Sequence, residues 1–441
     1  PAFISAGPGT GVLIPTFGPF PAPPGEFIGI AGSFLDREDW SQELKIVSPV
    51  EDRFRWELGG YYYYFDEDFV RDIGPLGNTG DDFNIRTWAI FGLAEYDFTE
   101  QFTASLELRY QDEVKSRTNL SPALSGNPAA FGTFEASFEE VLGRLILEYD
   151  VNENINIYGS VARANKPGGV NNETSRNIAA LNPDQSIGLF QEELAWNYEI
   201  GIKSQWFDDR LGANVAVFFS DIEDIQLTES IDTALCGGVF GIQPCAPGAF
   251  IDNKDAAEIL GVEVELFANP IEGWDFNVNY AFTDAEITKG NDINELRYFG
   301  QFDISGRTIP RTARHQLSVS TQYSRPLFNS GVDYYVGGNY SYLGKQFVQV
   351  HNRAIIPESH VVGVNFGIRN ERFNFKVFGK NVFDEDAPVG GLRFIDTGTP
   401  IAAFFPNIDG SGNQVTLYFP RSYEIFPRRP SQWGAELTVN F

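Results

Sequence analysis

The sequence predicts an all-β fold, a transmembrane antiparallel β-barrel whose strands follow one another as an up-and-down meander. Three observations predict it. Apolar and polar residues alternate along many long segments, short and long connections alternate between those segments, and no apolar run of about 18 residues offers a membrane helix. The 441 residues are enough for one large domain, and 15% of them are aromatic.

Alternation with a period of two marks the predicted strands. The clearest segments, in chain order, are "RFRWELGGYYYYF" (53–65), "FTASLELRY" (102–110), "LAWNYEIGIKSQWF" (194–207), "LGVEVELFA" (260–268) and "WDFNVNYAFTDAEI" (274–287). Many of them exceed the five or six residues that are usual for a strand in a soluble sheet. We therefore expect strands long enough to cross a membrane.

The chain ends within such a segment, "QWGAELTVNF" (432–441). Every second residue of it, from Trp433 to Phe441, is apolar or small and lies on one face of the expected strand. We expect this strand to close the barrel, with Phe441 as the terminal signal, and to be paired on both sides so that no open edge remains.

The connections between the segments alternate in length. Tight turns are expected at residues 48–52, 98–101, 150–154, 207–209, 269–273 and 369–371. Long excursions are expected at residues 66–82, 114–136, 228–253 and 384–430. A meander with short turns at one end and long loops at the other is typical of outer-membrane barrels, which have periplasmic turns and extracellular loops.

The alternation also predicts which face meets lipid. Arg or Lys on the lipid face near the midplane costs about 2–4 kcal/mol, so Arg109, Lys203 and Lys376 are expected to face a hydrated lumen. The apolar faces then point outward. An aromatic girdle is expected at the segment ends, from Tyr110, Tyr149, Tyr158, Trp206 and Trp274.

Charge and cysteine content narrow the function further. The net charge of −28 argues against a nucleic-acid partner, because phosphate binding requires a basic surface. The two cysteines, Cys236 and Cys245 in "CGGVFGIQPC", suit a small disulfide loop in an oxidising compartment. A soluble β-sandwich, propeller or jelly roll also alternates, but such folds use shorter strands and do not separate their loop lengths.

Several stretches resemble the barrel of TonB-dependent outer-membrane receptors. In chain order they are "WSQELKIVSPVEDRFRWELGGYYYYFDED" (40–68), "YGSVARANKPGGVN" (158–171), "WNYEIGIKSQWFDDRLGANVAVFFSDIEDIQL" (196–227), "AAEILGVEVELFANPIEGWDFNVNYAFTDAEI" (256–287), "FKVFGKNVFDEDAP" (375–388) and "RRPSQWGAELTVNF" (428–441). The ordered set is specific to the family, although it does not identify a ligand.

The resemblance implies a domain organisation. Receptors of this family have about 22 barrel strands after a plug domain and a TonB-binding box, whereas about fifteen strands and no plug can be counted here. We expect residues 1–40 to be an extracellular loop segment, residues 40–49 to run toward the periplasm, and residues 41–441 to be the C-terminal portion of the barrel. The plug and the first strands would then be missing, and this portion would neither gate nor couple to energy.

Three motifs could be binding sites, but each is expected to have a structural role instead. "KPGG" (166–169) is expected to be a turn at the end of a strand rather than a ligand contact, and "NIDGSGN" (407–413) a loop turn rather than a calcium loop. The acidic "FDEDF" (65–69) is expected to be a solvated loop rim rather than a cation site.

Catalysis and bound cofactors have no support in the sequence. His315, His351 and His360 are scattered, and the family's haem signature is not found. No paired-carboxylate, Ser/His/Asp, HExxH or Walker arrangement appears, so we expect no enzyme activity, no cofactor and no metal site.

Ligand contacts are expected from aromatic and cationic residues of the long loops. The candidates are Arg297, Tyr298, Phe299, Phe302, Phe404, Phe405, Tyr418 and Arg421. Flat rings and a guanidinium suit the catecholate rings of an iron chelate, and they suit sugar faces equally well. Packing of the loops on one another is the alternative for each residue.

The resemblance implies a monomeric receptor in a Gram-negative outer membrane, in contact with lipid and lipopolysaccharide, that takes up a ferric siderophore or a similar iron complex. The TonB energy-coupling protein would act through the plug. An oligosaccharide, cobalamin or an aromatic compound is an alternative cargo. A passive porin-like channel and a soluble β-rich module are the remaining alternatives.

Overall fold

A computed structural model describes residues 2–4, 29–72, 78–119, 133–171, 189–231, 248–292, 300, 303–328, 330–395, 401–406, 413–418 and 421–440. These residues form β-strands and the connections between them. Within these ranges, no helix is long and apolar enough to cross a membrane.

Fifteen strands of eight or more residues form one antiparallel sheet in the described part of the chain. They are β2 (Gly29–Val47), β3 (Phe54–Asp72), β4 (Asn78–Asp97), β5 (Phe102–Asn119), β6 (Thr133–Asn152), β7 (Ile155–Lys166), β10 (Glu193–Trp206), β11 (Leu211–Ile231), β12 (Gly248–Ala268), β13 (Trp274–Lys289), β15 (His315–Pro326), β16 (Asp333–Leu343), β19 (Ser359–Arg369), β20 (Phe373–Lys380) and β25 (Gln432–Val439). Each pairs with the next in this order, which confirms the predicted meander and its strand number.

Short strands extend this sheet or form separate hairpins. β1 (Ala2–Ile4) pairs with β2, and β14 (Arg307–Thr308) pairs with β13. The separate pairs are β8 (Gly169–Val170) with β9 (Leu189–Phe190), β17 (Gln346–Phe347) with β18 (Ile355–Ile356), β21 (Gly390–Ile395) with β24 (Arg421–Phe426), and β22 (Ile401–Pro406) with β23 (Asn413–Tyr418).

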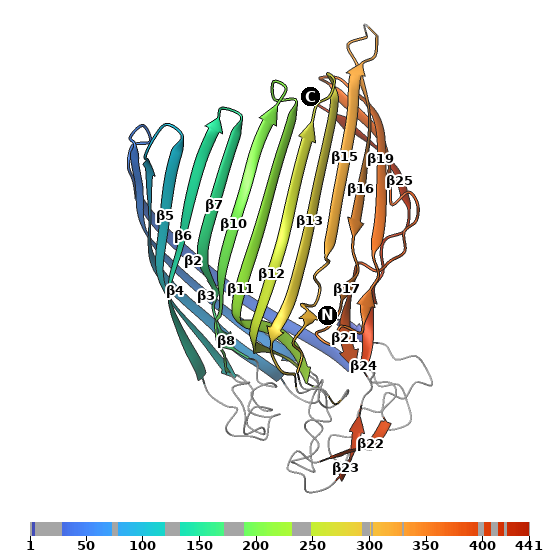
Figure 1. The fold of residues 1–441 in the computed structure, drawn as a ribbon. Coiled ribbons are helices and arrows are strands. Elements are labelled where there is room, and N and C mark those ends of the chain that lie inside the picture. The colour runs from blue at the N-terminus through green and yellow to red at the C-terminus, as the bar shows by residue number, and fades with distance from the viewer. Residues whose placement is uncertain are drawn as a thin grey trace.

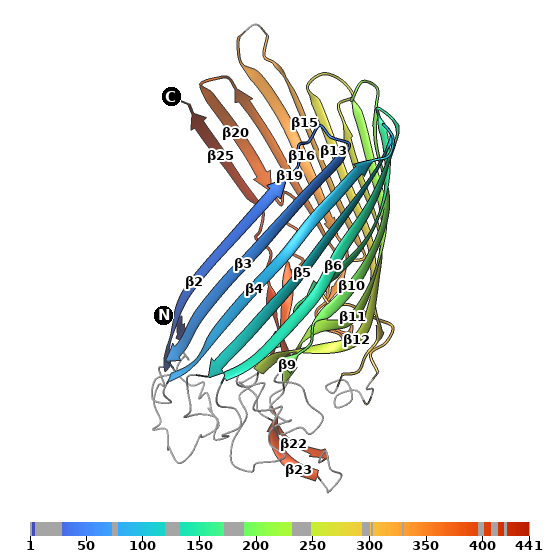
Figure 2. The ribbon, with the colours of Figure 1, turned by 90° about the vertical axis from the view of Figure 1, so that its left-hand side faces the viewer.

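The connections separate by length as the sequence predicted. All six expected tight turns lie at one end of the sheet, and the turn between β15 and β16 (327–332) is a seventh that was not predicted (Figure 1). The strand ends that flank the longer connections lie at the opposite end, which we call the loop end. β2 runs toward the short-turn end, as expected for residues 40–49 (Figure 2).

The strands reach further toward the loop end than the sequence predicted. β3 continues to Asp72 and β4 begins at Asn78, so most of the expected excursion at 66–82 is paired strand, and "FDEDF" lies inside β3 rather than on a loop rim. β2 begins at Gly29, so the boundary placed at residue 40 falls within a strand. Charged residues do not break a strand when both neighbours supply backbone pairing. A bilayer is spanned by about 9–11 residues of a tilted strand, whereas the longest strands here have about 20 residues, which extend about 66 Å at about 3.3 Å per residue. These strands therefore continue well beyond the membrane.

The two faces of the sheet differ in chemistry. Across eight neighbouring strands, the register aligns Trp56, Ala94, Leu106, Leu145, Val161, Tyr198, Phe219 and Leu260 on one face. One position further along, the opposite face presents Glu57, Leu93, Glu107 and Arg144. We call these the outer face and the inner face.

Curvature identifies the inner face as the concave one. Side chains on it reach across an intervening strand: the Arg109 guanidinium on β5 lies 5.5 Å from the Tyr61 ring on β3, and Tyr335 on β16 donates a hydrogen bond of 2.8 Å to Asn374 on β20. Such reach requires side chains that converge. Figure 1 shows the same curvature, because the blue strands pass behind the green and yellow ones.

Apolar burial is small in the described part of the chain. Ile222, Ile225 and Ala257 form one buried cluster near the loop end, and Ile287 and Ile304 are fully buried nearby. Large apolar side chains are instead exposed on the outer face, such as Ile200, which is 62% exposed. Contiguous apolar exposure of this kind indicates a surface that meets another apolar phase.

The predicted pairing of the last strand on both sides stays a prediction. β25 pairs with β20 on one side, and among the described residues it has no second partner strand, so the sheet that they form is curved but not closed. Phe441 lies outside the described residues. Closing a barrel requires that the two edge strands meet in register, which a terminal segment cannot specify by itself.

Candidate functional site

Charged side chains on the inner face lie in cross-strand pairs. Arg144 on β6 is 2.6 Å from Glu107 on β5, and Lys376 on β20 is 2.9 Å from Glu436 on β25. Arg109, Lys203 and Lys376 all lie on this face, which confirms that prediction. These ion pairs satisfy the charges of Arg144 and Lys376 in what would be the interior of the barrel.

An aromatic ring lies over a glycine of the neighbouring strand at several inner positions, with a cation against the ring. Phe91 covers Gly59, where an added Cβ would lie 2.3 Å from the ring, and Arg109 lies 6.0 Å from the ring centre. Lys203 is similarly placed over Tyr158, which covers Gly201. The glycine gives the ring room to lie flat, and the ring then supports the cation through a cation–π contact.

Tyr158 is therefore not part of an outer girdle. Its register places it on the inner face, and its hydroxyl donates a hydrogen bond of 2.6 Å to Glu199. Tyr110, Tyr149, Trp206 and Trp274 lie on the outer face, as predicted. Alternation along "NINIYGSV" groups Tyr158 with the polar Asn156 and Ser160, so the sequence pattern itself places Tyr158 on the inner face.

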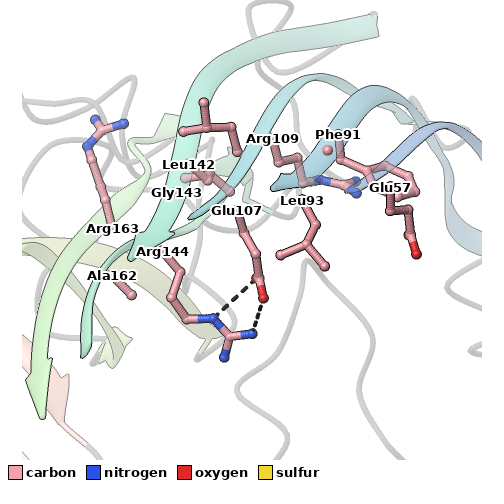
Figure 3. Close-up of a pocket in the computed structure, with 12 residues that line it drawn as sticks. Glu57, Phe91, Leu93, Glu107, Arg109, Leu142, Gly143, Arg144, Ala162 and Arg163 are labelled. Atoms are coloured by element: carbon pink, nitrogen blue, oxygen red, sulfur yellow. Dashed lines mark hydrogen bonds and ion pairs between the residues drawn. The ribbon is translucent and has the colours of Figure 1, made fainter. Parts of the chain in front are cut away.

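A hollow of about 450 Å³ lies against β3 to β7 (Figure 3). Charged side chains from the inner face line it, namely Glu57, Glu107, Arg109 and Arg144, together with the apolar Phe91, Leu93 and Leu142. Glu107 is occupied by Arg144, as the dashed lines of Figure 3 show. Arg109 donates through Nε to Gln111 Oε1 at 2.9 Å, and its terminal nitrogens have no acceptor among the described residues. The hollow thus suits a polar or anionic group.

The chain that leaves β7 is fixed to the inner face near the loop end. The Gln226 side-chain amide on β11 donates to the carbonyl oxygens of Lys166 and Pro167, both at 3.1 Å, and Gln191 at 3.0 Å. Lys115 on β5 donates to the Gly168 carbonyl at 2.9 Å from the other side. "KPGG" is therefore the predicted turn at the end of β7, and it is also anchored against both walls.

Two carboxyl groups face one another beside this turn. Arg163 pairs with Glu140, and Asn165 donates a hydrogen bond of 3.1 Å to Glu192. Burial raises the pKa of Glu192, and the facing Glu140 carboxyl adds to that increase. The Asn165 amide and Arg163 act in the opposite direction, so the cluster is a balanced link between β6, β7 and the residue that precedes β10.

The predicted ligand contacts are only partly placed. Arg297, Tyr298, Phe299 and Phe302 lie outside the described residues, as do Cys236, Cys245 and residues 407–412 of "NIDGSGN". Phe404 and Phe405 are on β22, Tyr418 is on β23 and Arg421 is on β24. Figure 1 shows the β22–β23 hairpin beyond the loop end, while β21 and β24 lie next to the sheet. Their roles as ligand contacts stay a prediction.

The three histidines lie in three separate places. The hydroxyls of Tyr280 and Tyr340 are hydrogen-bonded to Nδ1 of His315 and His360, respectively, on the outer face. His351 is buried in the connection after β16, where its Nδ1 accepts the Arg353 N–H at 3.0 Å. Within the described ranges, no three His, Cys, Asp or Glu side chains are grouped as metal ligands.

Three buried amides that organise the loop end were missed in the sequence. They are Gln226, Asn171, which exchanges two hydrogen bonds with the Ile251 backbone, and Asn381. Asn381 adopts a φ of 51° and bonds the backbone of Glu385 and Arg429. Turn chemistry could have identified Asn381, since Asn tolerates a positive φ. Gln226 and Asn171 depend on contacts between distant segments.

The protein-family model described as "TonB dependent receptor-like, beta-barrel" matches residues 10–394. Among curated proteins, the pesticin receptor of Yersinia enterocolitica is 26% identical over 208 residues, which are 47% of this chain and 27% of that protein.

Solved structures share the fold. The ferric yersiniabactin uptake receptor FyuA from Yersinia pestis superposes with a TM-score of 0.68 at 18% identity, over 94% of this chain and 55% of that one. The siderophore receptor PiuA from Acinetobacter baumannii gives a TM-score of 0.62 at 16% identity, over 92% and 56%. The chain thus spans about half the length of the solved receptors that it matches.

Proposed function

The chain belongs to the family of TonB-dependent receptors, and from that premise we propose that it forms the barrel of an outer-membrane receptor that takes up a ferric siderophore or a similar iron complex. The family consists of transport receptors, which are β-barrels of Gram-negative outer membranes. The whole receptor would use a plug domain inside the sheet and the TonB protein as its energy source, as the family resemblance implies.

The separation of the two faces carries the transport part of this proposal. An exposed apolar outer face suits lipid, and an inner face of paired charges suits a hydrated interior. A soluble β-rich module would bury the apolar face instead.

The cargo part rests on the relatives. The matched proteins bear the names pesticin receptor, ferric yersiniabactin uptake receptor and siderophore receptor. An iron chelate with aromatic or anionic donor groups would also suit the rings and guanidinium groups expected at the loops and observed on the inner face.

Iron-dependent abundance tests the cargo. The full-length protein would be quantified in outer membranes from the source organism grown with and without available iron. A large increase on iron withdrawal is the expected result, followed by binding assays with purified ferric chelates. Unchanged abundance would overturn the iron assignment and favour an oligosaccharide, cobalamin or aromatic cargo. Ion conductance by the full-length protein would favour a passive channel.

A further inference from the structure

The outer face is interrupted by a hollow of about 490 Å³ that spans β6 to β12. Its floor is Gly159 on β7, which lies between Leu147 on β6 and Ile200 on β10. Tyr198, Val217 and Phe219 form its far side. The side chains that project into it from the outer face are aliphatic or aromatic, and the Tyr198 hydroxyl is the one polar group among them, so the hollow suits an apolar ligand.

The floor is open because Gly159 has no side chain. A Cβ built at Gly159 would meet only the Glu199 carbonyl oxygen, at 3.7 Å, which is an ordinary contact. The rim residues remain exposed, Tyr198 at 44% and Leu147 at 42%. The hollow is therefore empty of protein, and its volume lies within the roughly 300–1,000 Å³ range of sites that hold small ligands.

We propose that this hollow, the Gly159 groove, seats one acyl chain of a phospholipid from the periplasmic leaflet. The proposal rests on the outer-membrane assignment above. The groove is continuous with the exposed apolar outer face, which makes lipid its neighbour on every side. Hydrocarbon that fills a concave apolar site gains close contact that a flat wall does not offer.

The depth of the Gly159 groove in the membrane indicates which leaflet supplies the lipid. Gly159 lies four residues after Ile155, where β7 leaves the tight turn at 153–154, so it is about 13 Å along the strand from the short-turn end. In barrels of this class that end faces the periplasm. Phospholipid occupies the periplasmic leaflet, whereas lipid A occupies the outer one.

Filling the groove tests the proposal in the full-length protein. Gly159→Leu places a side chain in the hollow, and Val217→Phe fills it from β11 if the first variant fails to fold. Gly60→Leu is the matched control, because Gly60 is on the outer face of β3, outside the groove, and a Cβ there would meet only the Ala89 carbonyl oxygen at 3.9 Å. Each protein would be extracted from outer membranes in mild detergent, and its folded state would be checked by heat-dependent gel mobility.

Native mass spectrometry then counts the lipid retained. We expect one phospholipid on the wild-type protein and on Gly60→Leu, and loss of it from the folded groove variants. The inference would be overturned if the wild-type protein carried no lipid or if all variants retained the same amount of phospholipid. It would also be overturned if lipid A were bound instead, or if a second copy of the protein covered the groove. Recovery of the chain in the soluble fraction would overturn the outer-membrane assignment itself, and a change of cargo would leave the lipid result intact.

Discussion

At the scale of single residues, buried amide side chains fix the segments of the loop end to the sheet through hydrogen bonds to their backbone. Gln226 holds three backbone carbonyl groups, and Asn381 holds the "NVFDEDAP" turn that follows β20. Each satisfies backbone groups that would otherwise lose their hydrogen bonds away from water. The family-like motifs therefore coincide with positions where one side chain fixes a loop to the wall.

Replacing Asn381 should destabilise the loop end. Asn381 is 6% exposed, its amide nitrogen donates to two carbonyl groups, and its oxygen accepts the Glu385 N–H at 2.8 Å. We expect Asn381→Ala to lower the free energy of unfolding by about 2–3 kcal/mol, measured by urea unfolding in detergent micelles. Asn381→Gly should recover about 1 kcal/mol of this, because glycine adopts the positive φ without strain. Equal stability of Asn381→Ala and wild type would contradict this role.

Glu385 should make stability depend on pH. The backbone N–H groups of Ala387 and His360 donate to its carboxylate and lower its pKa below the ordinary 4.5. A lowered folded pKa stabilises the fold above the unfolded pKa, and this contribution is lost as pH falls through the folded pKa. Melting temperatures of wild type and Glu385→Gln should thus differ at pH 7 and converge as the pH falls below the folded pKa of Glu385. Glu153→Gln, in the turn at the opposite end, is the control, and a constant difference across pH would refute the assignment.

At the scale of elements, the strands are built from two independent surfaces. Their outer positions expose apolar side chains, and their inner positions place rings over glycines with cations on the rings. The turns add their own local chemistry: Phe207, Asp208 and Asp209 all adopt positive φ, at 59°, 54° and 64°, in the tight turn before β11. A substitution should therefore have an effect set by the face it lies on.

Gly59 and Gly60 are adjacent on β3 and test this difference. An added Cβ at Gly59 would lie 2.3 Å from the Phe91 ring, whereas at Gly60 it would meet only a carbonyl oxygen at 3.9 Å. We expect Gly59→Ala to cost about 1–3 kcal/mol of unfolding free energy, because the ring must move away from Arg109. Gly60→Ala should be neutral or stabilising by less than about 1 kcal/mol. Equal effects in the same urea assay would show that the inner rings are not tightly packed.

At the scale of the whole molecule, the sheet separates two environments. All seven tryptophans, Trp40, Trp56, Trp88, Trp196, Trp206, Trp274 and Trp433, lie on the outer face, between 39% and 66% exposed. Exposure of that many large amphipathic rings is costly in water and favourable at a membrane interface. The net charge of −28 therefore coexists with an apolar exterior.

Tryptophan fluorescence should report lipid contact directly. In bilayers whose acyl chains carry bromine, we expect strong quenching of the tryptophan emission, since all seven indoles face outward. Acrylamide in the aqueous phase should quench it weakly. Trp433→Phe and Trp40→Phe would show whether the two edge strands behave like the central ones. Strong quenching by acrylamide together with weak quenching by bromine would place the outer face in water.

The sequence by itself determined the strands, their order, the two faces and the end at which the tight turns lie. These features follow from a period of two and from turn residues, which are local, and the motifs at 158–171 and 375–388 added the family. It could not determine how far the strands extend, because backbone pairing at residues 66–72 and 78–82 depends on the neighbouring strand rather than on side-chain polarity.

Only the tertiary structure decided what distant segments do together. Gln226 meets residues 166, 167 and 191, and Arg109 reaches across β4 to Tyr61, because curvature brings the inner side chains together. Gly159 leaves a groove on the outer face because side chains of β6, β10 and β11 surround a position that has none. Within the described residues, the unpaired edge of β25 is likewise a property of the sheet as a whole. Local alternation specifies a surface, and the way in which that surface bends specifies its sites.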